Sequence, residues 1–405
     1  MDFARSAHPG VQAQLDRLTM LSPAGDRLGL DRIAALLDRL GRPQDALPPV
    51  FHIAGTNGKG STIAFLRAAL EASGLRVHVF TSPHLVRFNE RIRIGGTLID
   101  DEALAALLDE ALDASNHIEP SFFEAATAVA LLAFARSPAD ACILEVGLGG
   151  RLDATNVITK PLVTGIASLG LDHQQFLGSD IASIAREKAG IAKRGVPLVS
   201  LAQPAEAEAA IAKAAADAGA ALLLEGRDWS VDPDIQPGLA GTHQRRNAGL
   251  AWAMLDAQDR LSVLRATFLE AIQKARWPAR FQRLSDGPLT HGVPTWIDGA
   301  HNPSAAAALA DLLAEHGPVH LILGILANKD VDAIVSALAP HALSLTFIPV
   351  PDHAHHDPAN LAARFGGRAA QSIEDALADL PTPRLIAGSL YLAGAALEAN
   401  GEMPD

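Results

Sequence analysis

The chain has 405 residues and a formal net charge of -13 at pH 7, with 49% hydrophobic and 4% aromatic residues. Its length exceeds what one hydrophobic core usually serves, and its composition excludes a disordered or fibrous chain in favour of an α/β protein of two domains. The negative charge would repel a polyphosphate backbone and no dense Lys/Arg stripe offsets it, so nucleic acid is excluded as an expected partner.

Through the first two-thirds of the chain, short apolar segments with strand character alternate with segments of helical pattern. A strand at 50–54 precedes a helix at 62–73 and a second strand at 77–80. This order predicts parallel βαβ units in one doubly wound α/β sheet, with the ligand at the carboxyl ends of the strands. Further strands are expected at 141–146, 162–166 and 197–200, and one amphipathic helix is expected over the Ala-rich stretch 205–221.

A new series of strands and helices begins after Arg280 and Phe281, and it predicts a smaller, Rossmann-like C-terminal domain. The stretch 284–294 contains two glycines and two prolines and suits a connection between domains. We therefore place the boundary near residue 282, with one domain over residues 1–282 and the other over 283–405. The expected strands of the second domain are 295–298, 319–325, 344–349 and 384–387.

A glycine-rich loop, Gly55-Thr56-Asn57-Gly58-Lys59-Gly60-Ser61, connects the first strand to its helix. Glycines let backbone N–H groups approach a phosphate, the helix N-terminus adds partial positive charge, and the lysine can reach a terminal phosphate. The spacing departs from the usual P-loop, because the first glycine of that pattern is missing and Gly60 separates Lys59 from Ser61. A turn without a ligand is the alternative, but three glycines around one lysine favour a phosphate site, with the Ser61 hydroxyl available to Mg²⁺.

Six further blocks follow the loop: SPHL at 82–85, NERI at 89–92, EVGLGGRLDATN at 145–156, LDH at 171–173, IAREKAGI at 184–191 and DGAHNP at 298–303. Together with GTNGKGS they resemble, in this order, the folylpolyglutamate synthase branch of the Mur ligase superfamily. The glycine after Lys59 resembles that branch rather than the cell-wall branch. Because several long blocks are collinear, chance is a poor explanation. The resemblance implies a Mur-ligase-type fold with a central ATP-binding domain and a smaller C-terminal domain.

The resemblance implies that ATP binds along the loop and at three positions farther along the chain. Asn247 resembles the residue that contacts adenine, Arg280 the arginine near the phosphates, and Asp298 the carboxylate that holds the ribose. An arginine near the γ-phosphate would neutralise charge during phosphoryl transfer. The implied ATP-binding residues are Asn57, Gly58, Lys59, Gly60, Ser61, Asn247, Arg280 and Asp298, and the implied catalytic residues are Lys59, Lys188, Arg280 and His301.

The resemblance also implies two Mg²⁺ ions, one held by Ser61, Ser82 and Glu145 and a second bound by His173. Carboxylate and hydroxyl oxygens suit magnesium, whereas imidazole is a less usual ligand, so His173 alone would be interpreted as a capping or core histidine. Lys188 would by default be an exposed lysine in local ion pairs. In the family the matching lysine is carbamylated (N6-carboxylysine), and a lysine of lowered pKa near cations would suit that reaction.

The pteroate or folate side of the site is implied at two segments. Flat pterin rings need apolar and stacking surfaces, although core packing is an equal alternative for the two phenylalanines of the first segment. A shorter match at 28–30, Leu-Gly-Leu, carries little weight. The implied pocket residues are Ser121, Phe122, Phe123 and Glu124, followed by Asp153 and Ala154.

The implied reaction is ATP-dependent ligation of L-glutamate to dihydropteroate, to tetrahydrofolate or to both, through an acyl phosphate that the amine of glutamate attacks. A peptidoglycan precursor synthetase is the nearest alternative, but it would need a nucleotide-sugar domain before the loop, which begins at Gly55. A nucleotide-binding regulator without ligase activity is the second alternative. The retention of Glu145, His173, Lys188 and Arg280 argues against it.

Several other features have ordinary interpretations. The histidine-rich stretch 352–357 could pass for a metal cluster, but prolines flank it as in a solvated loop. Ser389 resembles part of a C-terminal family segment and stays unassigned. Cys142 is the single cysteine, so no intramolecular disulfide or cysteine-based metal site is expected, and its place in a strand indicates a buried thiol.

The expected location is the cytoplasm. The N-terminal stretch MDFARSAHPG lacks the apolar core of a signal peptide, and no stretch approaches the ~20 apolar residues of a membrane helix. We therefore expect a cytoplasmic monomer with small-molecule substrates and no membrane partner.

Overall fold

The computed structural model describes residues 4–21 and 28–405, and the chain folds as two compact units. The first unit runs up to Gly238 and resumes at Arg245–Ala275, and the second comprises Leu239–Gln244 and Arg276–Asp405. The structural division thus comes before the boundary placed at residue 282, and it assigns a short earlier segment to the second unit. Residues 1–3, part of the stretch interpreted as lacking a signal peptide, lie outside the described residues.

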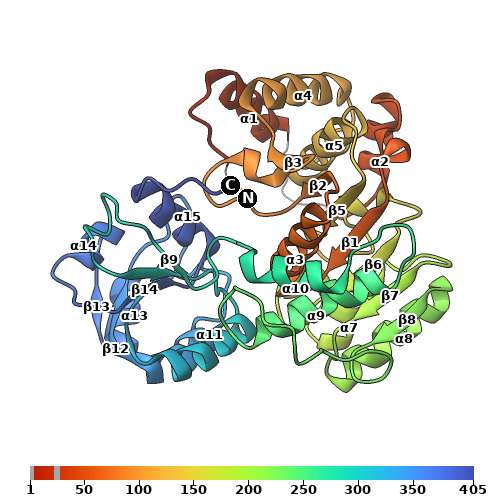
Figure 1. The fold of residues 1–405 in the computed structure, drawn as a ribbon. Coiled ribbons are helices and arrows are strands. Elements are labelled where there is room, and N and C mark those ends of the chain that lie inside the picture. Colours follow the sequence, from red (N-terminus) through yellow and green to blue (C-terminus); the bar gives the residue numbers. More distant parts are fainter. Residues whose placement is uncertain (1–3, 22–27) are drawn as a thin grey trace. The chain divides into compact units, whose positions relative to one another are not determined.

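The first unit is built on an eight-stranded sheet (Figure 1). Its strands are β1 (Val50–Ala54), β2 (Val77–Phe80), β3 (Ile92–Ile94), β4 (Thr97–Leu98), β5 (Ala141–Glu145), β6 (Val163–Ile166), β7 (Pro197–Ser200) and β8 (Ala221–Leu224). Their order is β4-β3-β2-β5-β1-β6-β7-β8; the strands from β2 to β8 in this order are parallel, and β3 and β4 add an antiparallel edge. The predicted doubly wound sheet is confirmed, and β1 lies inside it, buried along its whole length.

Helices cover this sheet and connect its strands. Two of them differ from the sequence prediction. The helix after β1 begins at Lys59 rather than Thr62, and the Ala-rich helix ends at Ala218 because Gly219 adopts a left-handed φ of 72°. The helices are α1 (Pro9–Leu21), α2 (Asp31–Arg39), α3 (Lys59–Ala72), α4 (Asp101–Ala114), α5 (Phe122–Ala135), α6 (Gln174–Leu177), α7 (Ile181–Ala189), α8 (Ala205–Ala218), α9 (His243–Asp256) and α10 (Arg265–Lys274).

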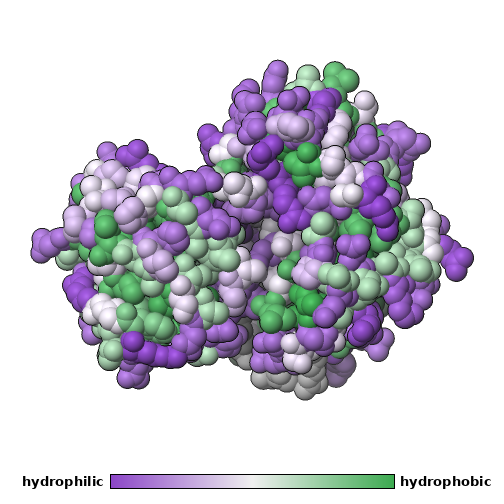
Figure 2. Space-filling view, turned by 90° about the horizontal axis from the view of Figure 1, so that it is seen from below, coloured by the Kyte–Doolittle hydropathy of each residue, from purple (hydrophilic) through white to green (hydrophobic). Residues whose placement is uncertain are grey.

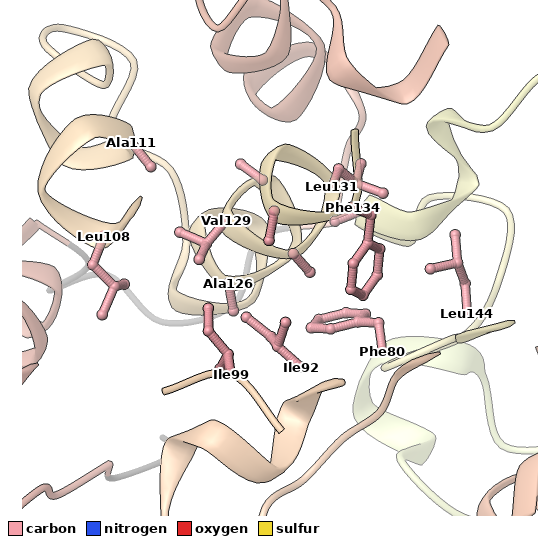
Figure 3. Packing of buried hydrophobic residues seen from close by; sticks show 14 of the residues in the cluster. Phe80, Ile92, Ile99, Leu108, Ala111, Ala126, Val129, Leu131, Phe134 and Leu144 are labelled. Carbon is pink, nitrogen blue, oxygen red and sulfur yellow. The ribbon is translucent and has the colours of Figure 1, made fainter. Parts of the chain in front are cut away.

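The main core of the first unit lies between α5 and the neighbouring strands. α5 contacts α1, α2 and α4 as well as the sheet, which explains why almost every one of its side chains is apolar. Phe80 of β2 and Ile92 of β3 pack towards the apolar side chains of this helix (Figure 3). The helix is therefore an interior support, and its first turn belongs to a segment predicted to line a ligand pocket.

The second unit has its own six-stranded sheet and core. Its order is β13-β12-β11-β14-β10-β9, and every pairing is parallel except that of β9 with β10. This confirms a Rossmann-like C-terminal unit. Its elements are β9 (Gln282–Arg283), β10 (Thr295–Ile297), α11 (Pro303–His316), β11 (Val319–Leu323), α12 (Val331–Leu338), β12 (Ala342–Phe347), α13 (Pro358–Phe365), β13 (Arg368–Ala369), α14 (Ile373–Leu377), β14 (Arg384–Ala387) and α15 (Leu390–Ala399).

The face drawn in Figure 2 mixes hydrophilic and hydrophobic side chains. Among the helices that the structure describes, none combines the length and apolar character needed to cross a membrane.

Candidate active site

The glycine-rich loop follows β1 at the carboxyl edge of the sheet and is pinned to the segment after β6. The backbone N–H groups of Thr56 and Asn57 both donate to Ser168 O, at 2.9 and 3.1 Å. Thr56 Oγ1 also donates to Gly170 O at 3.0 Å. Gly58 then takes a φ of 88° and caps α3. The loop is therefore held in shape by backbone contacts before any ligand binds.

The start of α3 offers the anion-binding geometry predicted for the loop. The N–H groups of its first turn have no carbonyl partner within the helix, and the helix dipole adds partial positive charge there. The Lys59 ammonium folds over the loop and donates to Gly55 O at 3.2 Å and Thr56 O at 3.4 Å. Asn247 of α9 lies against the loop, since a Cβ added to Gly58 would be 2.4 Å from Asn247 Oδ1. Asn247, predicted from sequence as the adenine contact, thus adjoins the glycine-rich loop.

Glu145 provides a carboxylate at the same edge. It closes β5, the neighbour of β1, and its Oε1 is 3.8 Å from Lys59 Nζ. Its Oε2 accepts the Ser82 N–H at 3.1 Å. Ser61 is buried in the first turn of α3. These oxygen donors fit Mg²⁺. Within residues 4–21 and 28–405 no three His, Cys, Asp or Glu side chains form a metal-binding group, so hydroxyl, phosphate or water oxygens would complete the shell.

His173 lies in the segment after β6, directly before α6. It is exposed and adopts a left-handed φ of 51°, so the core interpretation is wrong, and its side chain makes no capping hydrogen bond to the helix. Its N–H donates to the neighbouring Asp172 Oδ1 at 2.9 Å. Its role as a metal ligand stays a prediction.

Lys188 is buried in α7, and the default interpretation as an exposed lysine is wrong. Its Nζ donates to Gly55 O at 3.0 Å, so it lies beneath the phosphate loop. Burial lowers the pKa of Lys188 to about 7, and repulsion from Lys59 adds to the effect. The amine is therefore substantially unprotonated near neutral pH, as reaction with CO₂ requires. The neighbouring Glu187 pairs instead with Arg151, 36 positions earlier in the chain, at 2.9 Å.

Asp153 organises the loop after β5. It is buried, and its Oδ2 accepts the N–H groups of Gly147 and Leu148 at 3.0 and 2.9 Å. Its Oδ1 accepts the N–H of Thr155 at 3.0 Å. Burial raises the pKa of Asp153, and these donors oppose the rise. Ala154, also buried, begins a short 3₁₀ helix over Ala154–Val157.

The segment before α5 is a helix cap. Ser121 Oγ accepts the Glu124 N–H at 3.2 Å, and Glu124 Oε2 accepts the Ser121 N–H at 2.7 Å. Glu124 also forms a two-bond ion pair with Arg32 of α2, at 3.0 Å for each bond, which sequence reasoning missed because 92 positions separate the two. Phe122 and Phe123 are partly buried and pack on Phe88 and Phe80, with ring centroids 5.8 and 5.7 Å apart. Core packing is thus confirmed for both, and contact with a ligand stays a prediction.

Three predicted residues come together in the second unit. Asp298 follows β10 and is partly buried, and its oxygens accept the N–H groups of Phe281 and Ala300, each at 2.8 Å. Burial raises the pKa of Asp298, and the Arg280 guanidinium opposes the rise. His301 Nδ1 is 2.8 Å from Gly299 O. Arg280, Asp298 and His301 thus form one cluster, and their contact with a nucleotide stays a prediction.

The remaining features have the places that the sequence suggested. The stretch 352–357 is a loop, in which the His355 and His356 imidazoles bond to the carbonyl oxygens of His353 and Lys329. Ser389 caps α15 by accepting the Tyr391 N–H at 3.1 Å. Cys142 is buried in β5, and burial raises the pKa of its thiol.

The chain is similar to known proteins over nearly its whole length. The model of the Mur ligase glutamate ligase domain matches residues 279–384. Folylpolyglutamate synthase of Lacticaseibacillus casei is 36% identical, with 95% of this chain and 96% of that protein covered. Escherichia coli FolC in complex with DHPP and ADP superimposes with a TM-score of 0.86 at 32% identity, covering 98% of each chain. A bifunctional folylpolyglutamate synthase/dihydrofolate synthase with Mn, AMPPNP and L-glutamate bound gives a TM-score of 0.86 at 31% identity, covering 98% of this chain and 99% of that one. The chain therefore belongs to the folylpolyglutamate synthase/dihydrofolate synthase family of Mur ligases.

Proposed function

We propose that this enzyme uses ATP to join L-glutamate to dihydropteroate, to tetrahydrofolate or to both. The observation that carries the proposal is the convergence of Lys59 and Lys188 on Gly55 O, at 3.2 and 3.0 Å, with the Glu145 carboxylate 3.8 Å from Lys59. A binding module needs no such cluster of two lysines and a carboxylate. Further support comes from relatives whose names include both activities.

In the proposed reaction the acceptor carboxylate takes the γ-phosphoryl group of ATP, and the resulting acyl phosphate loses phosphate when the amine of glutamate attacks its carbonyl. Lys59 and Arg280 neutralise charge on the transferring phosphoryl group. His301, in the same cluster as Arg280, is a further catalytic candidate. The helix N-terminus at Lys59–Ser61 holds a phosphate, while Asn247 and Asp298 bind the adenine and ribose.

Ser61, Ser82, Glu145 and His173 are the proposed ligands of two Mg²⁺ ions, which when bound supply positive charge at the phosphates. The oxygen donors among them are hard ligands of the type magnesium prefers. Manganese in a related structure supports a divalent ion at this kind of site. Glu145→Gln should therefore weaken activation by Mg²⁺ while leaving the fold intact.

Carbamylation of Lys188 is proposed on the basis of its burial and its pKa of about 7. The neutral amine attacks CO₂, and a nitrogen proton leaves to give the carbamate. Native mass spectrometry of protein held in bicarbonate, together with ¹³C NMR after labelling with ¹³CO₂, tests this. The expected signal is one carbamate that Lys188→Met removes; its absence in active enzyme would contradict the proposal.

The function is tested by phosphate release with ATP, Mg²⁺ and L-glutamate, comparing 7,8-dihydropteroate, a tetrahydrofolate monoglutamate and no acceptor, with products identified by mass. A product heavier by one glutamyl unit identifies each activity separately. If ATP binds but neither pterin stimulates turnover, another Mur-type acceptor or a regulatory role is the better account.

A further inference from the structure

A chain of buried side chains connects the middle of β1 to the loop after β5. His52 is fully buried in β1, and its Nε2 is 2.8 Å from Thr155 Oγ1. Thr155 Oγ1 in turn donates to Asp153 Oδ1. The other oxygen of Asp153 holds the N–H groups of Gly147 and Leu148. Neither His52 nor Thr155 belongs to the catalytic or binding residues proposed above.

The direction of each hydrogen bond in this chain follows from its protons. Asp153 faces four donors, three N–H groups and one hydroxyl, so both of its oxygens act as acceptors. The Thr155 hydroxyl gives its single proton to Asp153 and must accept one from His52. The proton of His52 therefore sits on Nε2. Nδ1 of His52 is buried and, within the described part of the chain, has no hydrogen-bond partner.

The histidine is suited to holding a geometry rather than moving a proton. Burial lowers the pKa of His52 to about 3, with a smaller contribution from the positive charge of Lys193. The ring thus stays neutral in one tautomer across the physiological pH range, and the bond to Thr155 keeps one direction.

At its Asp153 end, this series of hydrogen bonds supports a predicted pocket residue. A Cβ added to Gly147 would lie 2.5 Å from Phe123 Cζ, so the Phe123 ring rests directly on the turn that Asp153 holds. A change in the orientation of Asp153 would release the turn and with it the surface under this ring. The ATP loop is held by different bonds, those of Thr56 and Asn57 to Ser168.

We propose that His52 and Thr155 are positioning residues that orient Asp153 and thereby shape the pocket for the pterin acceptor. The proposal rests on the function proposed above, because it takes a pterin to be the ligand of the pocket at Phe123. It predicts a selective effect: loss of the hydrogen-bond chain weakens acceptor binding and leaves ATP binding unchanged.

Four substitutions, made in two pairs, test the series of hydrogen bonds from His52 to Asp153. Thr155→Val and His52→Leu each remove one hydrogen-bonding group. Thr155→Ser keeps the hydroxyl, and His52→Gln keeps an N–H donor near the position of Nε2. The first pair should raise KM for dihydropteroate roughly 3- to 10-fold, the range expected for one net hydrogen bond, with KM for ATP unchanged. The second pair should restore KM towards the wild-type value. If His52→Leu does not fold, the acceptor KM of Thr155→Val still tests the proposal.

His78 provides a matched control for burial. It is a fully buried histidine of β2 in the same sheet, its Nε2 is 3.1 Å from Ser137 O, and its ring stacks on Phe134 at 4.7 Å. His78→Leu should lower stability without raising the acceptor KM. An acceptor KM that Thr155→Val leaves unchanged, or that His78→Leu raises equally, would overturn the proposal.

The tautomer of His52 gives a readout that does not depend on turnover. Imidazole ¹⁵N NMR, assigned by loss of the signals in His52→Gln, should show a proton on Nε2 alone from about pH 5 to 8. Titration in this range, or a proton on Nδ1, would also overturn the proposal. If the wild-type enzyme uses neither pterin, the proposed function fails; if it is active and Thr155→Val binds the acceptor normally, only this inference fails.

Discussion

Lys188 is a basic residue with a buried side chain, so the stability of the folded protein should depend on pH. Its pKa is about 7 in the folded protein against an ordinary value of 10.5. Between these values the unfolded chain binds the proton more tightly, so the free energy of unfolding should rise with pH. The rise is at most about 5 kcal/mol, since each unit of pKa difference corresponds to about 1.4 kcal/mol. Denaturant unfolding in CO₂-free buffer, with wild type compared to Lys188→Met, measures it.

Lys213 serves as the control, because its side chain is exposed on α8 beside Asp217. Lys213→Met should follow the wild-type pH profile. A flat difference between wild type and Lys188→Met from pH 7 to 10 would show that the amine is not held in a low-dielectric site.

Single residues of the site were predictable where a motif names them and unpredictable where tertiary structure sets their environment. The glycines and Lys59 follow from the order strand, loop, helix. The burial of Lys188 was hidden, because Gly55, whose carbonyl oxygen it contacts, lies 133 positions earlier in the chain. The hydrogen bonds of Asp153 were hidden as well. This residue caps the short helix at Ala154–Val157 and also accepts the N–H groups of Gly147 and Leu148.

At the scale of elements, the junction between β1 and α3 depends on a glycine whose replacement would strain the backbone and displace Asn247. Gly58 has a φ of 88° and its missing Cβ would clash with Asn247 Oδ1. Gly58→Ala should therefore distort the loop and lower kcat/KM for ATP by roughly 100-fold or more, comparable to loss of a phosphate-stabilising donor. Steady-state kinetics at varied ATP measures the effect.

Gly74, after α3, is the matched control. Its φ is 81°, and a Cβ there would meet no atom within 4 Å. Gly74→Ala carries the same backbone penalty, so it should lower stability by about 1 kcal/mol and leave the kinetics unchanged. Equal kinetic losses in both variants would assign the effect to backbone strain alone.

The first turn of α5 should depend on the ion pair between Arg32 and Glu124. The Glu124 side chain is 4% exposed and that of Arg32 26%. Arg32→Met leaves a carboxylate in an apolar setting and should cost roughly 1–3 kcal/mol, reduced by the partial exposure of the arginine. A double-mutant cycle with Glu124→Gln, measured by chemical denaturation, isolates the coupling.

The exposed pair of Arg136 and Glu110, at 2.7 Å with side chains 51% and 44% exposed, gives the comparison. Arg136→Met should cost less than about 1 kcal/mol. A cost as small for Arg32→Met would mean that Glu124 is stabilised by its cap alone.

Most elements were predictable because apolar runs of strand length alternate with helical patterns between turn residues. β7 and β14 match their predicted bounds. The Ala-rich stretch was misjudged at its end, since alanine gives no apolar periodicity that marks where a helix stops, and only Gly219 and Ala220 separate α8 from β8. The structural division between the units differs from the boundary placed near residue 282, because it depends on contacts between residues rather than on turn residues.

At the scale of the whole molecule, two separate cores predict two unfolding events. Leu144 and Leu385 are fully buried in the sheets of the first and second unit. Leu144→Ala should lower only one calorimetric transition and Leu385→Ala only the other, each by 2–5 kcal/mol, the usual range for such truncations. A single transition that both variants move together would show that the units unfold as one.

The pinning of the phosphate loop to Ser168 limits how the enzyme can hold a negative ligand. Two N–H groups at the start of the loop, those of Thr56 and Asn57, are bonded to a carbonyl oxygen rather than turned towards a ligand. In the proposed reaction the backbone N–H groups that face a phosphate are then chiefly those of the first turn of α3, which suits one phosphate group better than three. Because the protein has a net charge of -13, the other phosphates would be neutralised by individual basic side chains and by cations that bind together with the nucleotide. The scaffold thus selects for a ligand that brings its own counterion, and a bare anion is a poor substitute.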